Sequence, residues 1–149
     1  MQTSISFSNK LPSNGRGVLT TRVLFVDDDQ NTTDLFKIVL SSSEFEVLTA
    51  SSGPDGIEMA RQFSPDVMVV DLLMPEMDGL MVCKEMRKFS NVPIIILSAV
   101  SRPGIVEQAL DEGADDYLTK PMNRNLLVAS INRLARRARV EQVSSTNYS

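Results

Sequence analysis

The stretch RVLFV (22–26) is a short, β-branched apolar run that is followed at once by three aspartates, Asp27 to Asp29. Nearly continuous apolar runs of this length are typical of strands that are covered by helices on both faces, as in parallel sheets. Four further runs of the same kind follow along the chain: EVLTA (46–50), DVMVV (66–70), PIIILS (93–98) and DYLT (116–119). The sequence therefore predicts five parallel strands.

Segments with helical spacing alternate with these runs. Residues 32–42 place Leu35, Ile38 and Val39 on one stripe, and Pro54 suits the first turn of a helix over 54–63. Further helices are predicted over 79–89 with a stripe of Val82, Cys83, Met86 and Phe89, over 103–112, and through Leu127, Ile131, Leu134 and Ala138. Alternation of this kind, with right-handed crossovers, predicts an α/β fold: a flavodoxin-like, doubly wound, five-stranded parallel sheet of order 2-1-3-4-5 with helices on both faces.

The length of 149 residues suits one domain. Residues 1–21 and 141–149 are rich in small polar residues and lack periodicity, which predicts a flexible arm and a flexible tail around a domain over 22–140. No apolar stretch approaches the roughly 20 residues that span a bilayer, and the N-terminal segment lacks the apolar core of a signal peptide. We therefore expect a cytoplasmic protein without a membrane partner.

The chain contains no histidine and a single cysteine, Cys83. This excludes zinc sites built from Cys and His, Ser-His-Asp triads and an intramolecular disulfide. The formal net charge of −4 does not favour nucleic acid as a direct partner. Acidic residues dominate up to residue 121, whereas the last predicted helix carries five arginines. That basic helix is either a solvated face or a surface for docking a partner, and the sequence leaves both interpretations open.

Polar side chains gather where the predicted strands end. The carboxylates of Asp27, Asp28 and Asp71 follow the first and third strands, Ser98 ends the fourth, and Lys120 follows the fifth. Ligands of open α/β sheets bind beyond the carboxyl ends of the strands, so these groups are expected to share one sheet edge.

Crowded carboxylates repel one another unless a cation neutralises them, and a set of oxygen ligands without His or thiolate fits Mg²⁺ better than zinc. One carboxylate could then accept a phosphoryl group, with the ammonium of Lys120 neutralising its charge and the hydroxyl of Ser98 donating a hydrogen bond to it.

Four motifs in this order, VDDD (26–29), DLLMPEMDG (71–79), ILSA (96–99) and GADDYLTKP (113–121), resemble the receiver domain of two-component response regulators over about 22–140. The length suggests the stand-alone, single-domain type. The resemblance implies a signalling domain rather than an enzyme, which assists its own Mg²⁺-dependent phosphorylation and dephosphorylation. It also implies that a sensor histidine kinase or a phosphotransfer protein donates the phosphoryl group, since this chain has no histidine.

The resemblance implies a role for each site residue. Asp71 would be the phosphoacceptor. Asp28 and Asp71 would bind Mg²⁺ directly, Asp27 through water, and Leu73 through its backbone carbonyl.

On the neighbouring strands, Lys120 would bind the phosphoryl group, Ser98 would be the switch hydroxyl, and Tyr117 the aromatic residue whose rotamer follows the active state. The output face would be formed by the fourth helix, fifth strand and fifth helix, about 103–139, for a downstream protein or a second copy of the chain.

Several of these residues also have a purely structural interpretation. Asp29 is predicted to cap the first helix rather than to bind metal. The methionines of the 74–86 segment, Met74, Met77, Met81 and Met86, are predicted to pack in the loop and core. Leu73 and Val100, two residues after the acceptor and the hydroxyl, are apolar and cannot orient an attacking water, which predicts slow self-dephosphorylation.

Three alternatives remain. A haloacid-dehalogenase-like phosphatase would use Asp27, in Asp27-x-Asp29, as its nucleophile, but such enzymes are usually longer. A degenerate receiver would bind partners without being phosphorylated, although all the chemical positions are filled here. A flavin-binding flavodoxin is disfavoured because no hydroxyl-rich phosphate loop follows the first strand.

Overall fold

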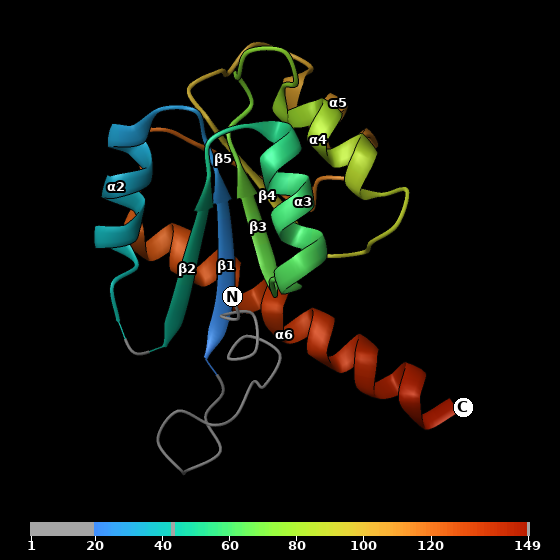
Figure 1. Ribbon diagram of the computed structural model, residues 1–149. Coiled ribbons are helices and arrows are strands. Elements are labelled where there is room, and N and C mark those ends of the chain that lie inside the picture. Colours follow the sequence, from blue (N-terminus) through green and yellow to red (C-terminus); the bar gives the residue numbers. More distant parts are fainter. Residues whose placement is uncertain (1–19, 43, 149) are drawn as a thin grey trace.

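Five parallel strands form one sheet in the order β2-β1-β3-β4-β5 in the computed structural model, which describes residues 20–42 and 44–148 (Figure 1). The strands are β1 (Thr21–Val26), β2 (Phe45–Ala50), β3 (Val67–Val70), β4 (Ile94–Ser98) and β5 (Asp116–Thr119). The predicted strands and their order are confirmed. The predicted arm lies outside the described residues up to residue 19, and its last residue, Thr21, already belongs to β1.

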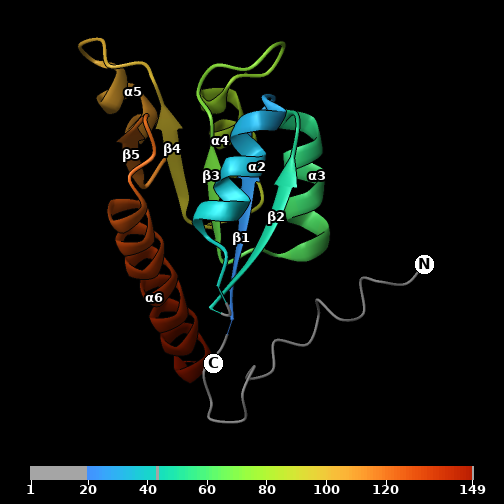
Figure 2. The ribbon, with the colours of Figure 1, turned by 90° about the vertical axis from the view of Figure 1, so that its left-hand side faces the viewer.

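Helices cover both faces of the sheet, as predicted. They are α2 (Gln30–Val39), α3 (Gly53–Phe63), α4 (Gly79–Met86), α5 (Ile105–Asp111) and α6 (Arg124–Tyr148). Successive strand residues point to opposite faces. Val23 and Phe25 of β1 therefore pack with α2 and α6, whereas Leu24 and Val26 pack with α3, α4 and α5 (Figure 2). Burial of β1 on both faces explains why its sequence is continuously apolar.

Three helices begin at the carboxyl edge of the sheet behind a side-chain cap. Asp29, Ser52 and Asp78 accept hydrogen bonds from backbone N–H groups in the first turns of α2, α3 and α4. Such caps satisfy donors that the helix itself cannot. The capping role predicted for Asp29 is confirmed, and its carboxylate also accepts a hydrogen bond from the Thr32 hydroxyl at 2.7 Å.

The predicted apolar stripe of α2 is wrong for Leu35 and Ile38, whereas its third residue, Val39, packs against the core as predicted. Leu35 and Ile38 are 49% and 71% exposed, and the buried residues of the helix are instead Thr33 and Phe36. The ring of Phe36 stacks on that of Phe25 at a centroid distance of 4.0 Å, which turns this side of the helix toward the sheet. Spacing alone could not separate the two faces because α2 has apolar residues on both.

Several helix ends differ from the prediction, including both ends of α2, which spans Gln30–Val39 rather than 32–42. Helix α4 ends at Met86 rather than Phe89, whose side chain is 41% exposed, and α5 begins at Ile105 because Gly104 takes a positive φ of 83°. Helix α6 continues to Tyr148, through the segment predicted to be a tail. No Gly or Pro follows Pro121, so no residue strongly opposes the extension. No helix in the described part of the chain is long and apolar enough to cross a membrane.

Candidate functional site

The acidic residues after β1 and β3 meet at the carboxyl edge of the sheet. Strands β1 and β3 are direct neighbours with Val26 opposite Val70, so the residues that follow them emerge side by side. Carboxylate oxygens of Asp27, Asp28 and Asp71 all lie within 4.8 Å of one another. Asp27 and Asp71 are 1% and 7% exposed, whereas Asp28 is open to solvent. A cation could therefore bind two buried carboxylates, Asp27 and Asp71, and one exposed carboxylate, Asp28.

Lys120 completes this cluster from β5. Its Nζ lies 3.2 Å from Oδ2 of Asp27 and 3.6 Å from Oδ1 of Asp71. The backbone N–H of Lys120 donates to the carbonyl of Ser98 at 2.8 Å, and the following Lys120–Pro121 peptide bond is cis. One ammonium accompanies three carboxylates, so a net charge of −2 is left when all three are ionised. Charge and oxygen ligands both fit a divalent cation such as Mg²⁺.

The carboxyl group of Asp71 resists ionisation. Burial raises its pKa above the ordinary value and the charge of Asp27 raises it further, while the Lys120 ammonium and the backbone N–H of Leu73 lower it by less. A bound cation would reverse this balance by favouring the ionised form. Asp71 is thus a carboxylate whose charge depends on what binds beside it.

Backbone groups hold the site in place, and the sequence analysis missed them. The N–H of Asp29 donates to Oδ1 of Asp27 at 2.9 Å, which orients that carboxylate. The N–H of Gly79 donates to the carbonyl of Leu72 at 2.8 Å, and a Cβ on Gly79 would stand 2.6 Å from the carbonyl oxygen of Asp71. A glycine is therefore required where α4 starts against the end of β3.

Ser98 and Tyr117 are linked through one residue. The Oγ of Ser98, fully buried at the end of β4, accepts a hydrogen bond from the N–H of Val100 at 3.1 Å. The hydroxyl of Tyr117 donates to the carbonyl of Val100. The apolar side chain of Val100 gives no sign of this role, which belongs to its backbone. The backbone of this residue connects the hydroxyl of Ser98, at the end of β4, with the hydroxyl of Tyr117 on β5.

The basic face of α6 is engaged within the chain. Arg137 lies 2.6 Å from Asp115, and Arg133 lies 3.1 Å from Asp116. Asp116 also accepts a hydrogen bond from the Ser130 hydroxyl at 2.6 Å. Two of the arginines therefore fasten α6 to the start of β5, an arrangement that the sequence analysis did not foresee.

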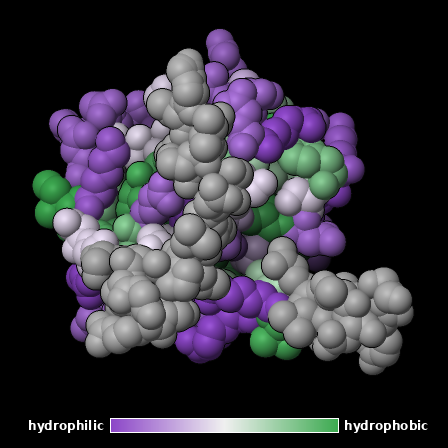
Figure 3. Space-filling view, turned by 60° about the horizontal axis from the view of Figure 1, so that its bottom comes forward, coloured by the Kyte–Doolittle hydropathy of each residue, from purple (hydrophilic) through white to green (hydrophobic). Residues whose placement is uncertain are grey.

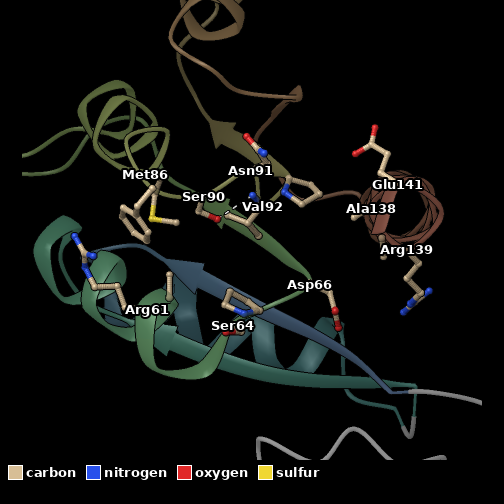
Figure 4. A pocket seen from close by; sticks show the side chains of 15 residues that line it. Arg61, Ser64, Asp66, Met86, Ser90, Asn91, Val92, Ala138, Arg139 and Glu141 are labelled. Atoms are coloured by element: carbon tan, nitrogen blue, oxygen red, sulfur yellow. Dashed lines mark hydrogen bonds between the residues drawn. The ribbon is translucent and has the colours of Figure 1, made fainter. Parts of the chain in front are cut away.

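A groove of about 1180 Å³ lies at the opposite edge of the sheet, where the strands begin. Its charged side chains do not converge, since Arg61 and Arg139 point away from each other (Figure 4). The described surface on this side mixes hydrophilic and hydrophobic patches (Figure 3).

The single cysteine, Cys83, is not a reactive thiol at neutral pH. Burial raises its pKa to about 12, so the thiol is protonated. The acidic edge is therefore the best candidate site.

Known proteins are similar to this chain in sequence. The chain matches the family model described as response regulator receiver domain over residues 23–132. It is 36% identical over 119 residues to the DNA-binding dual master transcriptional regulator RpaA of Synechocystis, which covers 78% of this chain and 49% of that protein. It is 34% identical over 126 residues to the transcriptional regulatory protein AfsQ1 of Streptomyces coelicolor, which covers 85% and 56%. The chain thus spans about half the length of these relatives.

Solved structures give the same result. The receiver domain of the Francisella response regulator 1452 has a TM-score of 0.75 and 32% identity, covering 80% of this chain and 99% of that one. A response regulator receiver domain protein from Clostridium thermocellum has a TM-score of 0.75 and 30% identity, covering 80% and 98%. With the family match over more than half of its length, the chain belongs to the response regulator receiver domains.

Proposed function

We propose that Asp71 accepts a phosphoryl group from a phosphohistidine of a partner protein and that this change is passed to the face formed by α5, β5 and α6. The observation that carries the proposal is the meeting of Asp71 with Asp27, Asp28 and Lys120 at one edge of the sheet. The chain has no histidine, so the donor must be another molecule, either a sensor histidine kinase or a phosphotransfer protein.

In the proposed transfer, a carboxylate oxygen of Asp71 forms a bond to phosphorus while the bond between phosphorus and the donor imidazole nitrogen breaks. The imidazole keeps the electron pair, and the product is an acyl phosphate on Asp71. Asp27, Asp28, Asp71 and the backbone carbonyl of Leu73 would hold Mg²⁺, which supplies positive charge to the transferring group. The ammonium of Lys120 supplies the second positive charge from the β5 side.

The hydrogen bonds through Val100 support a switch. An acyl phosphate adds acceptor oxygens, which favour a Ser98 hydroxyl that donates to them. If the Ser98 hydroxyl turns toward those oxygens, its Oγ moves away from the N–H of Val100. The backbone of Val100 can then shift, so that its carbonyl no longer accepts the Tyr117 hydroxyl in the same place. Phosphorylation would thereby favour a second arrangement of Tyr117 and of the helices beside it.

The output face combines apolar and charged side chains. On α5, Val106 and Leu110 are 41% and 47% exposed beside Glu107 and Asp111, and α6 carries arginines, two of which pair with Asp115 and Asp116 at the start of β5. Acidic and basic helices on one face are complementary to a second copy of the same face as well as to a downstream protein. We propose this face as the partner surface.

The proposed function is tested by intact mass spectrometry after incubation with acetyl phosphate and Mg²⁺. One phosphoryl adduct is expected with Mg²⁺, and none when EDTA removes the metal. A protein that stays unmodified at every Mg²⁺ concentration would favour the alternative of a receiver that binds partners without phosphorylation.

Slow loss of the phosphoryl group is a further proposal. The side chain of Leu73 is 62% exposed beside the acceptor and offers no group to orient water. Leu73→Asn is expected to speed hydrolysis roughly tenfold, because an amide could position the attacking water. The rate is measured by following adduct decay after removal of the donor. Leu35→Asn, at an exposed leucine on α2, is the matched control. Equal decay in wild type and Leu73→Asn would contradict the proposal.

A further inference from the structure

The methionine-rich segment of the β3–α4 loop plays no part in the proposed phosphoryl transfer. Met74 and Met77 are partly buried and pack against the core, and Met81 on α4 is 45% exposed. Because these methionines differ in burial, a chemical modification of the side chain is expected to affect the structure differently at each of them. The loop itself joins the acceptor Asp71 to α4, so any displacement of its backbone is passed directly to the site.

Met77 is packed tightly against the backbone of another element. Gly53 is the first residue of α3, and a Cβ at this glycine would stand 2.9 Å from both Cγ and Sδ of Met77. The thioether thus lies where a side chain of α3 would otherwise be. Gly53 has little freedom to retreat, because Ser52 caps the helix by accepting a hydrogen bond from the N–H of Asp55 at 3.2 Å.

The same side chain is within reach of small solutes. Met77 lines a groove of about 370 Å³ between α3 and α4, together with Pro54, Ile57 and Phe89. By contrast, Met68 and Met86 are 0% and 1% exposed and therefore closed to solvent. Met77 combines access to solvent with a contact that has no room for an added atom.

We propose that Met77 is a redox modification site, at which oxidation of the thioether by a peroxide displaces the β3–α4 loop and slows phosphoryl transfer to Asp71. The effect on transfer rests on the proposed function. With hydrogen peroxide, the sulfur attacks one oxygen with a lone pair, and the S–O bond forms as the O–O bond breaks. The proton of the attacked oxygen passes to the departing oxygen, which leaves as water. Sulfur loses two electrons and the peroxide gains them.

The loop is expected to be displaced because a sulfoxide is larger and more polar than the thioether of Met77. On the side that faces Gly53 there is no space for a sulfoxide oxygen or its water, so the oxidised side chain is expected to turn toward the groove. The capped start of α3 holds Gly53, so the β3–α4 loop is expected to shift, and with it the N–H of Leu73 that bonds to the Asp71 carboxylate. A displacement near 1 Å at a reacting group can cost up to about a hundredfold in rate, so a loss on the order of tenfold is expected here.

The test treats the full chain with hydrogen peroxide and uses three measurements. Peptide mass spectrometry gives sulfoxide occupancy at each methionine, acetyl phosphate with Mg²⁺ gives the phosphorylation rate, and hydrogen exchange gives the mobility of residues 72–79. Met77→Leu conserves volume and is expected to keep the untreated rate and to lose the sensitivity to peroxide. Met81→Leu is the matched control and is expected to stay as sensitive as the wild type. Reduction by methionine sulfoxide reductases should restore the rate.

Three results would overturn the proposal: no sulfoxide at Met77 when Met81 is oxidised, unchanged exchange over 72–79 at full occupancy, or equal loss of rate in Met77→Leu. Hydrogen exchange separates this proposal from the proposed function. If the untreated wild type accepts no phosphoryl group, the proposed function fails, while exchange over 72–79 still decides whether oxidation of Met77 displaces the loop.

Discussion

Asp71→Asn is expected to abolish phosphoryl uptake from acetyl phosphate while leaving the protein folded. The amide lacks the nucleophilic oxygen that would form the acyl phosphate, and it is also a weaker ligand for Mg²⁺. Intact mass spectrometry checks this result. Asp29→Asn is the matched control, since Asp29 is a nearby exposed carboxylate that caps α2 and asparagine caps a helix equally well. This control should take up one phosphoryl group at the wild-type rate.

Asp71→Asn should also be more stable to unfolding than the wild type at neutral pH in the absence of metal. The pKa of Asp71 is raised in the folded protein, chiefly by burial and next by Asp27. Its ionisation therefore costs folding stability as the pH rises above the ordinary aspartate range, and below that range the cost disappears. Thermal melts in EDTA should show Asp71→Asn more stable at neutral pH and equal to the wild type in acid. Added Mg²⁺ should raise the melting temperature of the wild type more than that of Asp71→Asn.

One pattern would contradict the assignment of the acceptor. An adduct that survives Asp71→Asn but disappears in Asp27→Asn would identify Asp27 as the nucleophile and favour the phosphatase alternative. Asp27 and Asp71 both lie beside Lys120, and each accepts a backbone N–H, from Asp29 and Leu73 respectively. The pair of variants therefore separates two carboxylates with similar partners.

The central strands could be predicted because every residue of β1, β3 and β4 is buried, whereas β2 and β5 at the sheet edges are mostly half-buried. Val23 to Val26 are covered on both faces, so apolar character is required at every position and the pattern is unambiguous. Helix α2 illustrates the opposite case. Leu35, Phe36, Ile38 and Val39 are all apolar, and Phe36, which stacks on Phe25, faces the sheet whereas Leu35 and Ile38 are exposed. That contact joins residues of two elements and has no signature in local spacing.

The side chains of the site could be predicted, but the backbone around them could not. Asp27, Asp71 and Lys120 each follow a strand, and parallel strands bring their ends to one edge, so their meeting follows from topology. The N–H of Asp29 and the peptide of Val100 act through groups that every residue carries, and residue type therefore gives no signal for them. Gly79 did have a signal, since a glycine at a strand-to-helix junction permits a close approach of two backbones.

Lys120→Met is expected to separate metal binding from phosphoryl transfer. The ammonium lies 3.2 Å from Asp27 and 3.6 Å from Asp71, so its removal leaves three carboxylates without a nearby positive charge. Mg²⁺ should then bind at least as tightly as in the wild type, because the site is more negative. Phosphoryl uptake should fall on the order of a hundredfold, since a charge that stabilises the transferring group is gone.

Isothermal titration calorimetry measures the Mg²⁺ affinity directly, which suits a chain without tryptophan. The time course of intact mass in acetyl phosphate gives the rate of uptake. Lys37→Met makes the same change of net charge at an exposed lysine in the last turn of α2 and should alter neither quantity. A merely structural role for Lys120 would weaken Mg²⁺ binding and uptake together. Tighter metal binding with slower uptake is the signature of a lysine that acts on the phosphoryl group, and a normal rate in Lys120→Met would contradict that role.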